Sequence, residues 1–500
     1  MNRTTQSLIA AVVALAAVTG FAAATVPDDS ADEGGRAAAR LPVERTSLLC
    51  PVPSSSDLAE TSYTAFTPKS EGSEEAGKAE LLPATRALTE AAVKGDEQDK
   101  KKAVKPFLTP KKPGEPVAAE KSGAESPALI GTAHGRLAPG WTVQQTTTYA
   151  AGSGRGVQGA NCTAPDTDFW FPGASTAKDR SDYVHLTNPD DSAAVVDIEL
   201  YGPDGPIKSE VGESIQVQPH GSVPVLLSTL IPKEQTNLTL HVTARSGRVA
   251  AAVQSSDDKL GGDWLPASAD PAGRVVLPGI PKDATSVRLV AFAPGTDDAD
   301  LKVQLASPTG SISPAGHATL HVKSGMTTAV DLGDVTKGEA GSLVLTPTED
   351  AVPVVAGLRV VRGKGSDQET AFIPGTSAVG TRATVADNRS KGSTLSLVAP
   401  GKTAKVRVTA SAGTEGGRSA TKTYTVKGGT TLGIKPPAPA GLKGAYALTV
   451  EPLSGAEVYG SRMLEIPEDG VPGFTIQTLP DDRGMVSVPK SEQDLTVLQK

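Results

Sequence analysis

Residues 183–205 read YVHLTNPDDSAAVVDIELYGPDG, and this stretch decides the fold class. Val196, Ile198 and Leu200 alternate with acidic residues, a pattern typical of a strand with one buried face. Turn-forming clusters bound the run on both sides, NPDD before it and GPDG after it. The stretch therefore predicts short β-strands joined by tight turns.

The same arrangement recurs about every 105 residues, which is too long for a solenoid unit and suits a small domain. In each copy a proline closes an apolar run, a glycine ends the next turn, a second glycine follows a later strand, and a valine lies in the last run. These landmarks are Pro189, Pro294 and Pro400; Gly205, Gly310 and Gly416; Gly221, Gly325 and Gly429; and Val249, Val354 and Val458. Their constant order indicates duplicated domains.

The best-preserved copy divides into seven strand-like runs, as expected for an immunoglobulin-like β-sandwich. We therefore predict an all-β chain of tandem immunoglobulin-like β-sandwich domains after an N-terminal hydrophobic helix. The predicted sandwiches span 166–270, 271–375 and 376–500, the last with a C-terminal extension, and a degenerate copy spans 44–165.

The degenerate copy contains an insertion at 68–127 that is rich in Lys, Glu, Ala and Pro. Such a composition offers too little apolar surface to offset the entropy of ordering, so the insertion is expected to be disordered. One short helix is expected within it, around residues 80–94.

The N-terminus carries Arg3 and then an apolar stretch over residues 8–25. This pattern fits either a cleaved signal peptide, residues 1–25, or an uncleaved membrane anchor of near-minimal length. Residues 26–43 follow as a linker. Both alternatives place the rest of the chain outside the cytoplasm, secreted or attached to the cell membrane.

Cys50 and Cys162 are the two cysteines of the chain. An even pair in an exported chain predicts a disulfide, here between the first strand of the degenerate copy and its end. The bridge would hold together a domain that is split by the insertion.

Sequence signatures of catalysis are missing: there is no nucleophile elbow, phosphate-binding loop or dinucleotide fingerprint. The glycine-rich residues 152–156 predict a hairpin turn. His317 and His321 would lie about 13 Å apart on a strand, too far for one metal ion. His185 and His241 are expected to face solvent.

Acidic pairs occur in loops, and the simplest interpretation is solvated turns; calcium binding is left open. They are Asp190 with Asp191, Asp257 with Asp258, and Asp297 with Asp298 and Asp300. Trp141, Trp170 and Trp264 fall near domain edges, which favours packing at inter-domain joints over a sugar-binding platform. The sequence therefore predicts no catalytic, metal-binding or cofactor-binding residues.

The run ANCTAPDTDFWFPGAS at 160–175 and the segment LAPGWTVQQ resemble a family of exported actinobacterial proteins whose domain is known only as one of unknown function. The resemblance covers most of the chain after about residue 40. It implies a location in the cell envelope, and it carries no catalytic residues.

A net charge of −8 gives no electrostatic footprint for nucleic acid. We expect a non-enzymatic envelope scaffold or binding protein whose partner is another envelope protein or a glycan, with the N-terminus in contact with the cytoplasmic membrane. The alternative is an accessory partner of membrane machinery that assembles surface glycans.

Overall fold

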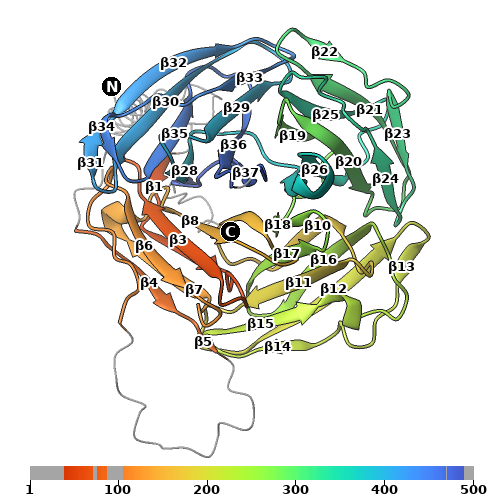
Figure 1. The fold of residues 1–500 in the computed structure, drawn as a ribbon, viewed down its shortest axis with the longest axis horizontal. Helices are drawn as coiled ribbons and strands as arrows, with labels where there is room; N and C mark the ends of the chain where they lie inside the picture. The colour runs from red at the N-terminus through yellow and green to blue at the C-terminus, as the bar shows by residue number, and fades with distance from the viewer. Residues whose placement is uncertain (1–38, 71–75, 87–104, 469, 489–500) are drawn as a thin grey trace, which may run out of the picture. The chain divides into compact units, whose positions relative to one another are not determined.

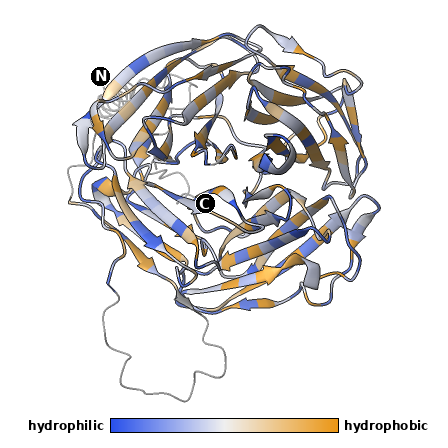
Figure 2. Cartoon of the chain, viewed as in Figure 1, coloured by the Kyte–Doolittle hydropathy of each residue, from blue (hydrophilic) through white to orange (hydrophobic). Residues whose placement is uncertain are grey.

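A computed structural model describes residues 39–70, 76–86, 105–468 and 470–488. These residues form antiparallel β-strands and three short 3-10 helices, and the described part contains no α-helix. Hydrophobic and hydrophilic residues alternate along the strands (Figure 2). The predicted all-β fold of tandem β-sandwiches is confirmed (Figure 1).

The predicted N-terminal hydrophobic helix and most of the linker lie outside the described residues. Within the described ranges, no helix has the length and apolar character needed to cross a membrane.

The second sandwich contains all seven strand-like runs predicted from sequence, distributed over two sheets. The first sheet comprises β10 (Asp168–Ala174), β16 (Leu238–Ser246), β12 (Ala194–Gly202), β13 (Gly205–Ile207) and β14 (Ile215–Val217). The second comprises β18 (Gly261–Leu265), β17 (Ala250–Asp257), β11 (Arg180–Thr187), β15 (Gly221–Leu226) and β5 (Thr85–Arg86). The strand β18 is an addition that the seven-run prediction lacked.

The third sandwich repeats this plan. Its first sheet comprises β19 (Val275–Ile280), β25 (Gly341–Pro347), β21 (Ala299–Ala306), β22 (Ser311–Ile312) and β23 (Thr319–Val322). Its second comprises β24 (Thr327–Asp331), β20 (Ala284–Phe292), β26 (Val355–Arg362) and β27 (Glu369–Pro374). Again the last strand, β27, is one that the sequence pattern did not predict.

The fourth sandwich follows the same order. Its first sheet comprises β28 (Ala383–Asn388), β35 (Tyr446–Pro452), β30 (Ala404–Gly413), β31 (Gly416–Arg418), β34 (Ala440–Lys443) and β32 (Ala420–Val426). Its second comprises β33 (Thr430–Ile434), β29 (Ser393–Ala399), β36 (Tyr459–Glu465) and β37 (Phe474–Thr478).

The first sandwich is more complete than expected. Its first sheet comprises β2 (Arg45–Cys50), β7 (Leu129–His134) and β4 (Lys78–Pro83). Its second comprises β6 (Val117–Ser122), β3 (Ala59–Phe66), β8 (Thr142–Tyr149) and β9 (Gly156–Asn161). The hairpin predicted at 152–156 is present, because β8 pairs with β9 across it.

Two expectations for the insertion at 68–127 are therefore wrong. Residues Lys78–Arg86 form strands rather than a helix, and β6 is a paired strand rather than a disordered segment. Ala79 and Leu81 are fully buried, so β4 needs few apolar residues to pack. The strand β6 pairs with one neighbour, β3, and stays largely exposed, so its polar composition suits an edge strand. Residues 71–75 and 87–104 lie outside the described ranges.

Contacts within the chain divide it into two compact units. One consists of Met1–Leu41 and Ser487–Lys500, and its described residues are 39–41 and 487–488. They lie in the strands β1 (Ala39–Pro42) and β38 (Met485–Val488), which pair with each other. The other, Pro42–Val486, contains all four sandwiches. The domain boundaries at 165, 270 and 375 stay predictions, because joined sandwiches do not show where an independent folding unit ends.

Candidate functional site

The four sandwiches of residues 42–486 meet through equivalent strands. In each sandwich the last strand in sequence order, which we call the closing strand, lies at the edge of the second sheet. The closing strands are β9, β18, β27 and β37. Each contacts the next in chain order, and β37 contacts β9, so the contacts form a complete circuit. The strands β18 and β37 can be followed toward the middle of the ribbon in Figure 1.

Buried polar side chains occupy this meeting point, which we call the central joint. They are Gln158, Asp263, Glu369, Thr475 and Gln477, each at most 2% exposed. They come from all four closing strands, so no single sandwich contains the whole set.

Glu369 of the third sandwich links the first and the fourth. Its Oε1 accepts a hydrogen bond from the backbone N–H of Val157 (2.8 Å), and its Oε2 accepts one from Phe474 N–H (2.9 Å). Burial raises the pKa of this carboxyl to about 7, although the hydrogen bonds that it accepts oppose the shift.

Asp263 of the second sandwich links the same two neighbours. Its Oδ1 accepts from Gly159 N–H (2.9 Å), and the Thr475 hydroxyl donates to the carboxylate at 2.9 and 3.1 Å. Gln477 Nε2 donates in turn to Thr475 Oγ1 (2.7 Å). Burial raises the pKa of Asp263 well above its usual value, and the nearby charge of Glu369 adds to the shift.

Two glycines of β9 allow the carboxylates and amides to approach the backbone so closely. Gly156 has φ +109°, and a Cβ there would overlap Glu369 Oε1. A Cβ on Gly159 would overlap the side chains of Gln477 and Thr475. The central joint therefore requires glycine at both positions, because any side chain there would displace the polar groups of the neighbouring strands.

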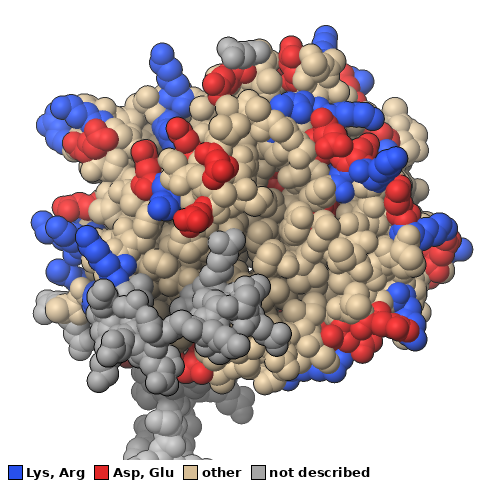
Figure 3. Space-filling model, turned by 60° about the horizontal axis from the view of Figure 1, so that its bottom comes forward, with Lys and Arg blue, Asp and Glu red and all other residues tan. Residues whose placement is uncertain are grey.

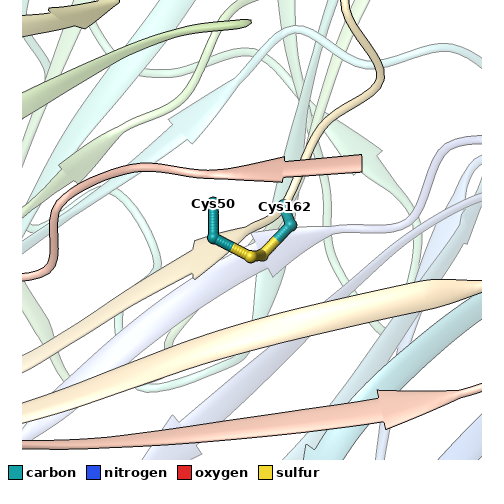
Figure 4. Close-up of a disulfide and its surroundings, with 2 residues drawn as sticks. All are labelled: Cys50 and Cys162. Carbon is teal, nitrogen blue, oxygen red and sulfur yellow. A yellow bond between two sulfur atoms is a disulfide. The ribbon is translucent and has the colours of Figure 1, made fainter. Parts of the chain in front are cut away.

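The predicted disulfide between Cys50 and Cys162 is present, with a Cα–Cα distance of 4.4 Å (Figure 4). It joins the end of β2 in one sheet to the residue after β9 in the other, so it ties the two sheets of the first sandwich together. Leu49 and Thr163 exchange two backbone hydrogen bonds beside it. The bridge therefore also fixes the end of a closing strand.

Two cavities open between the second and third sandwiches. The larger, of about 470 Å³, is lined by Asp166, Asp168, Trp170, Asp270, Pro271 and Pro294. The Trp170 ring stacks on His241 with a centroid distance of 3.7 Å and is 7% exposed, so it does not offer a free face to a sugar.

The smaller cavity, of about 280 Å³, has a different character, and we call it the arginine pocket. Its charged lining residues are Arg180, Arg288, Arg359, Lys259, Asp179 and Asp257. Positive side chains outnumber negative ones, which sets this pocket apart from the acidic cavity beside Trp170.

The expectation that His185 and His241 face solvent is wrong. His185 is 6% exposed, packs edge-on against Trp264 (5.3 Å between ring centroids), and has its pKa lowered to about 4 by burial. The first sandwich covers this outer face of the second, as the packing of Ala250 with Ile130 shows. His241 lies between Asp168 (2.9 Å) and Glu199 (3.0 Å), with 15% of its side chain exposed.

His317 and His321 do not form a pair. His321 is exposed and binds Asp300 through Nδ1 at 2.8 Å, while His317 is half-buried. The acidic loops are engaged in ion pairs and turn hydrogen bonds. Examples are Asp190 with Arg248 and Asp257 with the N–H groups of Lys259 and Leu260. Among the described residues, no group of three or more His, Cys, Asp or Glu side chains is placed to hold a metal ion.

The tryptophans divide between two environments. Trp170 packs against Phe292 of the third sandwich (5.5 Å between centroids), as predicted for an inter-domain joint. Trp141 lies in the core of the first sandwich instead.

The sequence pattern did not point to Asp263 and Glu369. Their strands, GGDWL and ETAFIP, lack the alternation that marks a half-buried strand.

The model of a family of unknown function, DUF5719, matches residues 117–437, well over half of the chain. A comparison with curated proteins found no match. The matched range contains the second and third sandwiches and three of the four closing strands, and it agrees with the resemblance carried by the FWFPG stretch. The chain therefore belongs to the family of unknown function DUF5719.

Proposed function

We propose that this protein is a non-enzymatic scaffold or binding protein of the cell envelope, acting outside the cytoplasm. The observation that carries the proposal is the central joint, where buried side chains of four sandwiches interlock. Such a joint holds the loops and cavities of residues 42–486 in fixed positions, which is what a binding platform requires.

The disulfide supports the proposed location. Disulfides persist in oxidising compartments and are rare in the reducing cytosol. Cys50 and Cys162 are both buried, and the bridge between them ties the two sheets of the first sandwich together.

The distribution of charge supports a role in binding that does not involve nucleic acid. Positive and negative side chains occur close together on the face shown in Figure 3, with uncharged residues over much of the rest. A net charge of −8 is consistent with this mixture.

The proposal is tested by deleting the gene and comparing cell shape, adhesion and surface glycan with the parent strain. Altered shape or adhesion with normal glycan supports the scaffold, whereas loss of glycan supports the accessory role in glycan assembly. Mass spectrometry of the protein from intact cells under non-reducing conditions tests the location. Free thiols at Cys50 and Cys162 would contradict an oxidising compartment.

A further inference from the structure

We propose that the arginine pocket binds a phosphate group, either as inorganic phosphate or as a phosphate ester carried by a small envelope molecule. This inference deepens the proposed function, on which it rests, by naming the chemistry of a ligand.

The pocket is built across the joint between the second and third sandwiches. Arg180, Asp257 and Lys259 come from the second sandwich, whereas Arg288 and Arg359 come from β20 and β26 of the third. Its volume of about 280 Å³ accommodates a phosphate group and part of the molecule that carries it.

Arg288 and Arg359 lie directly opposite each other on paired antiparallel strands. Side chains in such positions are close neighbours on one face of the sheet, and like charges there destabilise the fold. A folded protein tolerates this arrangement more easily when an anion binds between the two guanidinium groups. The direct pairing of two arginines at a cavity is therefore a feature that a ligand explains.

The positive charges in the pocket are incompletely neutralised. Arg180 forms a buried pair with Asp182 (2.6 Å), Arg288 approaches Asp331 (3.4 Å), and Lys259 approaches Asp179 (3.7 Å). In the described part of the chain, the guanidinium of Arg359 has neither a hydrogen bond nor an ion pair, although its backbone pairs with the neighbouring strands. Burial, and after it the charges of Arg180 and Arg288, lower the pKa of Arg359 to about 10, while Asp257 acts in the opposite direction.

The neighbouring groups suit an oxyanion in particular. Guanidinium groups bind phosphate through two parallel hydrogen bonds, and several of them converge here. Arg180 is held in place by Asp182 and by the Phe372 ring, which lies 5.7 Å from its guanidinium carbon. Ser175, Thr236 and Gln368 add polar lining on the same pocket.

Calorimetric titration of the purified full chain with inorganic phosphate tests the inference, with chloride at equal ionic strength as the reference. We expect saturable binding of phosphate at one site. Arg359→Gln and Arg288→Gln should each weaken binding at least tenfold. Arg407→Gln removes the same charge from a surface pair with Glu451 in the fourth sandwich, and it should bind as the parent does.

A second measurement separates loss of the site from loss of the fold. Because each Gln variant removes one member of a like-charged pair, the melting temperature without phosphate should stay level or rise. The increase in melting temperature on adding phosphate should disappear in both variants. Unchanged phosphate binding in Arg359→Gln, or equal effects of phosphate and chloride on the parent, would overturn the inference.

The same titration with glycerol 3-phosphate distinguishes the two sources of the group. Tighter binding than that of inorganic phosphate assigns the pocket to an ester, and weaker binding assigns it to the free ion. Glucuronate should bind worst, and preference for it over both phosphates would contradict the inference. Since these measurements use purified protein, their failure is separable from failure of the envelope role, which the deletion strain tests.

Discussion

The interiors of the sandwiches and the central joint are both buried, but they are packed with different kinds of side chain. In the second sandwich, Val196, Ile198, Leu200 and Leu240 are at most 2% exposed and contact other apolar side chains. The central joint is equally buried, yet it consists of carboxylates, amides and a hydroxyl joined by hydrogen bonds. Apolar burial gives each sandwich its stability, whereas directional polar contacts fix how the sandwiches meet.

The two regions also overlap. Phe372 of the closing strand β27 belongs to the core of the second sandwich, and Phe474 of β37 belongs to the core of the third. A closing strand thus places a polar side chain in the joint and an aromatic ring in the interior of the preceding sandwich. We therefore expect damage to one interior to reach the next sandwich.

The largest expected effect on stability comes from Leu240→Asp, which places an unpaired charge in the apolar core of the second sandwich. We expect a loss of several kcal/mol in the free energy of unfolding. Hydrogen exchange should show loss of protection in the second sandwich and in β27. Ser246→Asp on the exposed end of the same strand is the control. Loss confined to β10–β18 would mean that the cores are not coupled.

Replacing Cys50 and Cys162 by serine should have the next largest effect. The bridge spans a sequence separation of 112 residues. The chain-entropy model assigns such a closure at most about 4–5 kcal/mol, an upper bound because strain and residual structure intervene. Hydrogen exchange measured at increasing urea concentration should show the strands of the first sandwich losing protection earlier than those of the others. Simultaneous opening of all four would show that the central joint dominates.

Gly156→Ala should perturb the central joint and leave the apolar cores of the sandwiches unchanged. The added Cβ would overlap the Glu369 carboxylate and would also strain the positive φ of residue 156. We therefore expect a loss of about 2–4 kcal/mol in thermal or urea unfolding. Gly152→Ala is a matched control in the same hairpin, because its φ of +93° is similarly unusual and a Cβ added there would have no other atom within 4 Å. Equal losses would attribute the effect to backbone conformation alone.

The smallest effect is a dependence of stability on pH. The raised pKa of Glu369, about 7 against a usual value of 4.5, means that the folded chain retains a proton that the unfolded chain has released. The free energy of unfolding should therefore fall as pH rises from 4.5 to 7, by at most about 3 kcal/mol. Asp263, whose pKa is also raised, contributes in the same direction.

Glu369→Gln should flatten this slope in urea unfolding measured across the pH range. It should also lower stability at pH 5, since the amide N–H₂ meets a backbone N–H donor. Glu457→Gln, which removes an exposed carboxylate, should leave the slope unchanged. A parent protein whose stability rises with pH over this window would contradict the assignment.

The parts of the fold predicted from sequence are those governed by local alternation. The runs around Val196 and Leu240 are half-buried strands, so their period of two was visible. The strands β18 and β27 are buried throughout, GGDWL and ETAFIP, and such strands lose the alternation. The prediction for the edge strand β6 was wrong for the opposite reason. The strand is largely exposed, so its composition resembles that of a disordered segment.

The candidate sites could not be predicted because they join residues that are distant in sequence. Glu369 and Val157 are separated by 212 positions, and Asp263 and Thr475 by the same number. Cys50 and Cys162 were the exception, because a chain with two cysteines has a single possible intramolecular disulfide. Arg288 and Arg359 became a pair only when the strand register was known.

The contact between β37 and β9 has a consequence for the evolution of this family. An open row of tandem domains can gain or lose a domain at either end, but a closed circuit of domains cannot do so without breaking the contact between the first and the last. Adding or removing one sandwich would separate the first from the last and leave Asp263 or Glu369 without a donor. Duplication in this lineage is therefore expected to have stopped at four copies, and a relative with three or five would need a different set of residues at its centre.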